Sequence, residues 1–321
     1  MTSATSVRPP RGRSDRLVGS LFGIGAAAAY GCVIVVQRSL AKDDLPVTTV
    51  VGGRYAIASV VLLTVLGLSR RPLMPEPGER LRAALLGMVG YVVHSTLVYL
   101  ALAHGTAAAV AMVFYLYPAV VAVLELVLRL RPPRLPVLLA PVLSGIGVAA
   151  VVASGERVDI SRTGVLLGLC AAFAVSVYLL TSSHLIRGSN PVVTAAWVAG
   201  GVGVSMATGG VALAGFSLPG EAVGRLLLAG ALTAGATTCV YASLRRLGAG
   251  PTAVFLALQS LVALVVAAVT LGEPMTAAQI FGGAALIAGA ALAATAKGKP
   301  PIPGPIAESP ATVAPPPTRR S

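Results

Sequence analysis

The sequence is poor in charged residues and in cysteine, and each shortage excludes a class of protein. Only 11% of its 321 residues are charged, whereas soluble domains carry about 25%. This difference excludes an ordinary soluble domain. The three cysteines, Cys32, Cys170 and Cys239, stand far apart, so they form neither a disulfide framework nor a metal-ligand spacing. We therefore expect no metal and no cofactor.

Long apolar runs make up most of the sequence. Apolar residues make up 56% of the chain, and its mean hydropathy is +0.86. A helix needs about 20 apolar residues to cross roughly 30 Å of hydrocarbon. Runs of about that length cover Leu17–Ser39, Pro46–Leu68, Leu81–Ala103, Thr106–Leu128, Pro136–Ser154, Gly164–Ile186, Pro191–Gly215, Ala222–Leu244, Gly250–Gly272 and Thr276–Ala296. The predicted fold class is all-α, a polytopic membrane protein of ten transmembrane helices.

The net charge of +13 suggests a nucleic-acid partner at first, but the positions of the basic residues exclude it. If the N-terminus is cytoplasmic and the loops alternate, 18 basic residues lie on the cytoplasmic side and five on the other. This bias follows the positive-inside rule, so both termini are predicted to be cytoplasmic. Arginines outnumber lysines by 21 to 3, which suggests a GC-rich bacterial gene. The expected location is a bacterial cytoplasmic membrane.

Polar tails enclose two units of five helices each. Residues 1–16 and 297–321 are rich in Pro, Arg and Ser and lack apolar periodicity, so we expect disordered cytoplasmic tails. Residues 17–154 and 164–296 are predicted to form a first and a second five-helix repeat. The connections between spans are too short for an independent soluble domain.

The second unit repeats the first. A shift of 145 residues superposes Gly19, Gly23, Ala26, Ala27, Ala29, Pro46, Val47 and Thr49 on Gly164, Gly168, Ala171, Ala172, Ala174, Pro191, Val192 and Thr194. A shift of 142 superposes Val98, Tyr99, Leu102, Leu116, Val120, Pro132 and Gly147 on Val240, Tyr241, Leu244, Leu258, Val262, Pro274 and Gly289. An odd number of spans inverts the second repeat. Many secondary transporters build alternating access from such inverted repeats around a midplane site.

The spans, the repeat and several local segments together resemble the EamA-type branch of the drug/metabolite transporter (DMT) superfamily. The segments that carry the likeness are Arg54–Ala58, similar to the family's Arg-Phe-x-x-Ala stretch, Tyr99–Leu102, Thr106–Ala109, Leu116–Pro118 and Leu271–Pro274. The resemblance implies a bundle of two inverted five-helix repeats that transports a small solute. Two departures stand out: Arg131-Pro132 where the family often has a glutamate, and Ser260 where the first repeat has Pro118.

Arg54 is a candidate for binding the solute. It lies eight residues beyond Pro46, which is roughly 12 Å along a helix. One interpretation is an arginine that snorkels to the outer headgroups. The other is a contact for an anion or carboxylate at the outer mouth of the cavity, to which a guanidinium is suited. The sequence leaves both open.

His94 and Glu125 are the candidates for proton coupling. His94 lies at the centre of the third span, a depth that suits a proton switch. A buried histidine bonded to a neighbouring serine or a backbone carbonyl is the alternative. Glu125, the one carboxylate within a predicted span, is either a proton carrier or the partner of Arg129 in an i,i+4 ion pair.

Other polar side chains lie too deep to anchor the helices to headgroups, so we expect them to line an internal cavity. With Arg54 and His94, the substrate-binding candidates are Tyr30, Tyr91, Tyr115, Tyr117, Tyr178, Trp197 and Gln259. For Trp197, an interface anchor or a packing role is the competing interpretation.

Small residues and prolines predict how the helices pack and bend. Small residues let transmembrane helices approach closely, and those expected to do so in the fifth and tenth spans are Gly145, Gly147, Gly282, Gly283 and Gly289. Pro118 and Pro141 are predicted to kink their spans.

The function favoured by these patterns is a secondary transporter that exports a small metabolite, amino acid or drug-like solute, with protons as a candidate coupling ion. The spans contain no His/Asp or Cys/His constellation, carboxylate pair or phosphate-binding loop, so an enzyme is not expected. A lipid flippase or a membrane protein without transport activity is the alternative. The expected partners are the solute and the lipid bilayer; the pattern also allows a homodimer.

Overall fold

We describe a computed structural model of the chain, which covers residues 13–41, 45–128, 130, 135–153, 160–185, 188–213, 220–271 and 275–295. Most of the two predicted tails, the Arg129 side chain and the segments 131–134 and 272–274 lie outside these residues.

The described chain is almost entirely helical. Its helices are α1 (Arg13–Ala41), α2 (Val47–Leu68), α3 (Arg80–Leu85), the π-helix η1 (Leu86–Tyr91), α4 (Val92–Leu102), α5 (Ala107–Phe114), α6 (Tyr117–Val127), α7 (Leu135–Ala153), α8 (Arg162–Leu185), α9 (Pro191–Leu213), α10 (Gly220–Leu247), α11 (Ala249–Ala257), α12 (Gln259–Leu271) and α13 (Ala277–Thr295). Three spans consist of consecutive shorter helices: α3–η1–α4, α5–α6 and α11–α12. Among the residues covered, nine segments are long and apolar enough to cross a membrane, and α7 contributes a shorter apolar stretch. The predicted all-α polytopic fold is confirmed.

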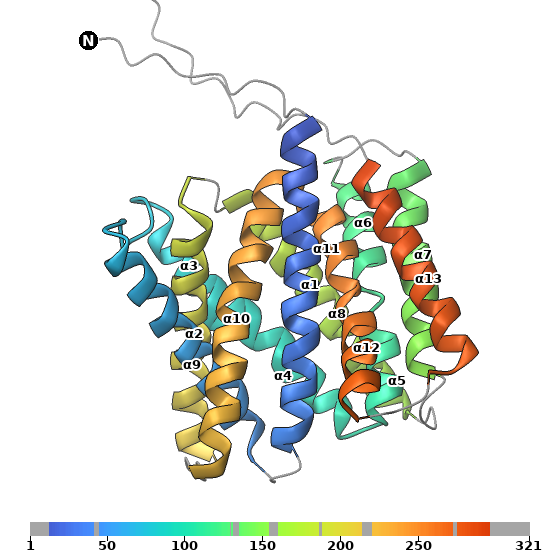
Figure 1. Ribbon diagram of the computed structural model, residues 1–321, viewed down its shortest axis with the longest axis horizontal. Coiled ribbons are helices and arrows are strands. Elements are labelled where there is room, and N and C mark those ends of the chain that lie inside the picture. Colours follow the sequence, from blue (N-terminus) through green and yellow to red (C-terminus); the bar gives the residue numbers. More distant parts are fainter. Residues whose placement is uncertain are drawn as a thin grey trace, which may run out of the picture.

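The helices run up and down through one bundle (Figure 1). The start of α1 and the end of α13 lie at the same end of this bundle, at the top of Figure 1. We call this the terminal end and the other the opposite end.

Polar side chains fix where several helices begin. Thr106 accepts a hydrogen bond from the Ala109 N–H at the start of α5, and Ser161 accepts one from the Gly164 N–H at the start of α8. At the start of α13, the Thr276 N–H donates to Gln279 while the Gln279 N–H donates to the Thr276 hydroxyl. This reciprocal pair is a capping box, which satisfies two N–H groups that a helix start leaves free.

The two halves pack through symmetry-related helix pairs. α1 packs on α10 and, correspondingly, α8 packs on α4. α1 also packs on α12, and its counterpart α8 packs on α5 and α6. α2 packs on α10, and its counterpart α9 packs on α3 and η1, while two further pairs, α2 with α9 and α7 with α13, join equivalent helices of the two halves. This pattern is that of two repeats related by an approximate two-fold axis, as expected for inverted repeats.

Glycines bring α7 and α13 into close contact. A Cβ atom on Gly147 would meet the Gly282 carbonyl oxygen, and one on Gly289 would meet the Ala140 carbonyl oxygen. The close approach predicted for the fifth and tenth spans is therefore confirmed at these positions. Gly145 does not take part, because a Cβ there would meet nothing within 4 Å, and Gly283 packs against Leu261 of α12 instead.

The fourth span of each repeat is broken at the same place. The first break falls at Tyr115–Leu116, between α5 and α6, and the second at Leu258, between α11 and α12. Leu116 and Leu258 are the residues that the 142-residue shift superposes. Pro118 explains the first break, because proline has no N–H to continue the helix. Pro141, by contrast, lies inside a continuous α7.

Candidate functional site

Arg54 is held inside the bundle by neutral groups. Its side chain is 6% exposed. Nη1 donates to Oε1 of Gln37 in α1 over 3.2 Å, and Nη2 donates to the hydroxyl of Tyr91 in η1 over 3.3 Å. The guanidinium carbon also lies 4.8 Å from the ring centroid of Tyr55, within cation–π range. The guanidinium therefore faces the interior, which favours the cavity interpretation over snorkelling.

Tyr30 connects the two repeats beside this arginine. Its hydroxyl lies 3.3 Å from the Tyr55 hydroxyl and 3.2 Å from Oγ1 of Thr237 in α10. Tyr30 is only half-buried although its hydroxyl is bonded inside the bundle. The space beside this ring is therefore not completely filled by protein.

Aromatic rings extend the site from Tyr91 toward the break in the fourth span. The Tyr91 ring centroid lies 4.8 Å from that of Tyr55, 4.5 Å from His94 and 6.1 Å from Tyr178. His94 in turn stacks 6.0 Å from Phe114. Offset and edge-to-face contacts of this kind are the favoured geometries of aromatic pairs.

The two helix breaks meet at the far side of these rings. The Tyr115 hydroxyl, at the first break, lies within hydrogen-bonding reach of the Gln259 side chain, beside the second. The Tyr117 hydroxyl donates to the Ala253 carbonyl of α11 over 3.2 Å. Each of these contacts joins one repeat to the other.

We call the connected set the central cluster: Tyr30, Arg54, Tyr55, Tyr91, His94, Phe114, Tyr115, Tyr117, Tyr178, Tyr241 and Gln259. Tyr241 belongs to it because its hydroxyl lies 2.6 Å from that of Tyr178. The cluster brings together all the substrate-binding candidates except Trp197. Trp197 donates its Nε1–H to the Leu73 carbonyl in the α2–α3 loop over 2.9 Å, a contact that suits the anchoring interpretation.

His94 is buried among aromatic rings. The side chain is 8% exposed, and its Nδ1 atom makes no hydrogen bond of good geometry. The backbone of Tyr91 lies within interaction distance of the imidazole, so a buried histidine bonded to a backbone carbonyl remains the alternative interpretation.

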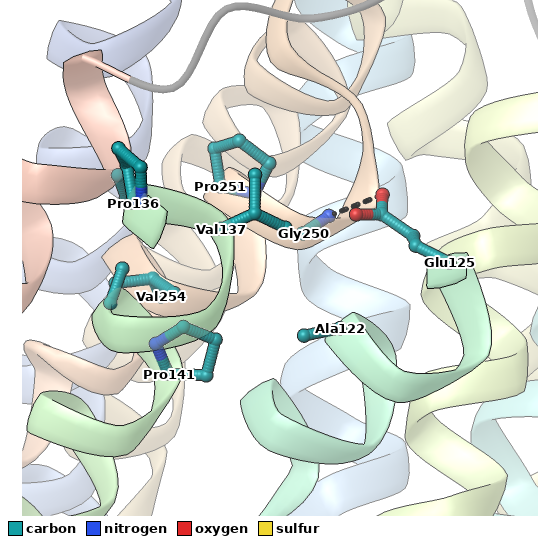
Figure 2. Close-up of a pocket in the computed structure, with 10 residues that line it drawn as sticks. Ala122, Glu125, Pro136, Val137, Pro141, Gly250, Pro251 and Val254 are labelled. Atoms are coloured by element: carbon teal, nitrogen blue, oxygen red, sulfur yellow. Dashed lines mark hydrogen bonds between the residues drawn. The ribbon is translucent and has the colours of Figure 1, made fainter. Parts of the chain in front are cut away.

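Glu125 lies apart from the central cluster, in the half of α6 nearer the terminal end. It is 4% exposed, and its Oε1 accepts a hydrogen bond from the Gly250 N–H over 3.0 Å. Figure 2 shows this contact at the edge of a small pocket between α6, α7 and α11. The pocket wall is otherwise apolar, and includes Pro136, Pro141 and Val254. The ion pair considered for Glu125 involves Arg129, which lies outside the described residues.

Four residues of the site were not among the candidates from the sequence: Gln37, Tyr55, Phe114 and Tyr241. Tyr55 lies near the middle of its predicted span, so depth was a usable signal for it, whereas Tyr241 lies three residues before the predicted span end at Leu244 and gave no such signal. Gln37 lies close to the end of α1, where a polar residue is ordinarily solvated. Among the residues that the structure describes, no group of three or more His, Cys, Asp or Glu side chains could hold a metal ion.

A comparison with protein families matches residues 17–153 and 162–295 to the EamA-like transporter family. The chain belongs to this family. One solved structure, with the uninformative title "Crystal structure of protein", is similar over 86% of this chain and 96% of its own length, with a TM-score of 0.70 and 17% identity. At that identity it shows the shared fold alone. No curated protein matches the sequence.

In this EamA-like bundle, polar contacts also join the repeats at both ends. At the terminal end, the Glu79 carboxylate accepts hydrogen bonds from the Gly188 and Ser189 N–H groups over 2.8 and 2.9 Å. The α11 helix beside the cluster on that side is buried along its whole length. At the opposite end, Nη1 of Arg225 donates to the Ser39 carbonyl over 3.0 Å. The central cluster lies between these two sets of contacts.

Proposed function

We propose that this chain is a secondary transporter that exports a small metabolite, amino acid or drug-like solute by alternating access. The observation that carries the proposal is the central cluster, which gathers buried polar and aromatic groups from both repeats. Polar groups in the hydrocarbon region are costly unless they have partners, and in membrane proteins they mark transport pathways. A cluster shared by two inverted repeats is where alternating access places its binding site.

The proposed movement is a rocking of the first four helices of each repeat about this cluster. The α7–α13 pair, which is tightly packed through glycines, would remain a support. Opening toward the terminal end breaks the Glu79 contacts, and opening toward the opposite end breaks the Arg225 contact. We place both termini in the cytoplasm of a bacterial cell, because the basic residues favour that orientation. The terminal end is then the cytoplasmic one.

Proton coupling through His94 and Glu125 is part of the proposal. Both side chains are buried, one in the central cluster and the other at the contact of α6 with α11. A buried titratable group between two repeats gives each conformation a different proton affinity, which is the requirement for coupling.

The experiment is flux through proteoliposomes that contain the purified chain. We expect labelled solutes from a metabolite panel to cross, with rates that depend on a pH gradient. His94→Ala and Glu125→Gln should remove the pH dependence, and His104→Ala, at an exposed helix end, is the matched control. Scrambling of labelled lipids without solute flux supports the flippase alternative and contradicts the proposal. Flux whose pH dependence is unchanged in both variants contradicts coupling through these residues.

A further inference from the structure

The central cluster has one permanent charge, and that charge has no counter-ion among the described residues. Arginine stays protonated in proteins. The groups that act on the Arg54 guanidinium are tyrosines and Gln37, all neutral. Glu125, a carboxylate of α6, is hydrogen-bonded to Gly250 on the terminal side of the helix break. A buried charge without a partner is strongly unfavourable, so a negatively charged ligand beside Arg54 would be stabilised.

The guanidinium also retains a donor for a ligand. Its Nε atom is buried and has no hydrogen-bond acceptor, while Nη1 and Nη2 are oriented by Gln37 and Tyr91. Nε–H and a neighbouring Nη–H are the pair that binds a carboxylate through two parallel hydrogen bonds. Gln37 and Tyr91 thus hold the arginine in place for such a ligand.

The groups around Arg54 limit the charge of the anion and the chemistry of the rest of the ligand. A single guanidinium balances one negative charge, so a phosphate dianion would leave one charge buried and unpaired. The groups around Arg54 are tyrosine rings and hydroxyls from Tyr30, Tyr55 and Tyr91, with Thr237 beyond. Such groups suit an organic part with apolar carbon and a few polar groups.

We propose that Arg54 is the anion-binding residue of the central cluster and that the transported solute is a small organic molecule with one free carboxylate. This inference rests on the proposed transport function and names the class of its solute. The carboxylate supplies the charge that the site lacks, and the tyrosines contact the remainder of the molecule. With a solute whose only charge is this carboxylate, the loaded site is electrically neutral, which lowers the free-energy cost of enclosing it within the bundle.

The test measures the melting temperature of the purified full-length chain with matched pairs of ligands. The probes are the twenty amino acids and a set of aliphatic and aromatic monocarboxylates, each beside its own primary amide, with sodium chloride and sodium phosphate at equal ionic strength. We expect at least one acid to raise the melting temperature by about 2 °C or more while its amide does not. Arg54→Gln should weaken binding of that acid at least about tenfold, and Arg54→Lys should restore part of it.

Arg162→Gln is the matched control, because it removes an exposed arginine at the start of α8, outside the cluster and outside the contacts at the two ends. Its response to the acid should equal that of the unmodified chain. If Arg54→Gln does not fold, the preference of the unmodified chain for acid over amide decides alone. Equal stabilisation by acid and amide, stronger stabilisation by phosphate or chloride, or no response to any acid overturns the inference. Flux in proteoliposomes separates the two proposals. If neutral or cationic solutes cross and carboxylates do not compete with them, the proposed transport function is retained and only this inference is contradicted.

Discussion

Single hydroxyl groups hold the central cluster together. Tyr30 lies at a branch point, in contact with Tyr55 of its own repeat and Thr237 of the other. Because these groups satisfy one another inside the bundle, each is both a structural contact and a polar group that a solute meets on entry. Removal of one hydroxyl therefore alters both stability and transport.

Tyr55→Phe tests this double role. It removes the 3.3 Å contact with Tyr30 and keeps the ring beneath Arg54. A buried hydrogen bond contributes about 1 kcal/mol, so we expect solute flux in proteoliposomes to fall about fivefold, with a lower melting temperature. Tyr99→Phe is the control, since Tyr99 is 52% exposed on the surface of α4. Equal flux in the two variants would contradict a role for the Tyr55 hydroxyl.

The depth of a polar residue within its span was enough to identify most site residues from the sequence. The sequence did not show which face of each helix points toward the interior of the bundle. Tyr91 and Gln259 stand out because a polar group at mid-span must face inward. Gln37 escaped because it lies near a helix end, where a polar residue needs no special explanation. The helix that carries Arg54 is apolar around its circumference, since lipid and protein core both favour apolar side chains. Its inward face therefore appears only once the neighbouring helices are known.

At the scale of the helices, the fourth span of each repeat is interrupted at the central cluster. The α5–α6 break carries Tyr115 and Tyr117 of this cluster, and the α11–α12 break carries Gln259. Half-helices joined by a short turn tilt independently, so these breaks are the natural hinges of the proposed rocking.

Pro118→Ala tests the first hinge. The alanine N–H can bond the Phe114 carbonyl and so join α5 to α6 as one continuous helix. We expect solute flux to fall at least about tenfold, while the melting temperature is unchanged or higher because a helix-breaking residue is lost. Pro141→Ala, in the continuous helix α7, should leave flux unchanged. A normal flux for Pro118→Ala would show that the break is not used in transport.

Gly147→Leu tests the α7–α13 support. A side chain at this position collides with the α13 backbone at Gly282, and overpacking of this kind costs about 1–3 kcal/mol. We expect a lower melting temperature and a smaller monodisperse fraction in size-exclusion chromatography. Gly145→Leu adds the same volume on the same helix, where nothing lies within 4 Å, and should behave like the unmodified chain. The opposite ranking would contradict the packing described.

The sequence predicted the first kink and the glycine contact because proline and glycine act through the backbone, whose geometry is local. It also predicted a kink at Pro141, but α7 continues through this residue without a break. Pro141 is the seventh residue of α7, so it removes one helical hydrogen bond without ending the helix. The second break has no proline, so its position could be inferred only from the repeat.

For the whole molecule, the contacts at the two ends decide which side of the bundle is open. Glu79 receives two backbone N–H groups from the other repeat, and Arg245 reaches the carbonyl of Ser189 in the same loop over 3.1 Å. Charge counting predicted which end is basic, but a bond between a carboxylate and distant backbone groups leaves no pattern in the sequence.

Glu79→Gln tests the terminal-end contact. The amide offers one acceptor and brings donors against the N–H groups of Gly188 and Ser189, so the terminal end should open more often. Spin labels at Arg71 and His184, both exposed at this end, should show a larger population at long distance. Asp15→Asn, an exposed acid of α1 at the same end, is the control. An unchanged distance distribution in Glu79→Gln would contradict the role of this contact.

Gene duplication produced two hinges at equivalent positions, yet they have diverged chemically. Pro118 makes the first a permanent interruption. At the second, Ser260 keeps its own N–H and donates its hydroxyl to the Ala257 carbonyl over 2.9 Å, so this helix retains the means to straighten and bend again. The two directions of the transport cycle therefore need not cross barriers of equal height, and a difference between them would make one direction of turnover faster than its reverse.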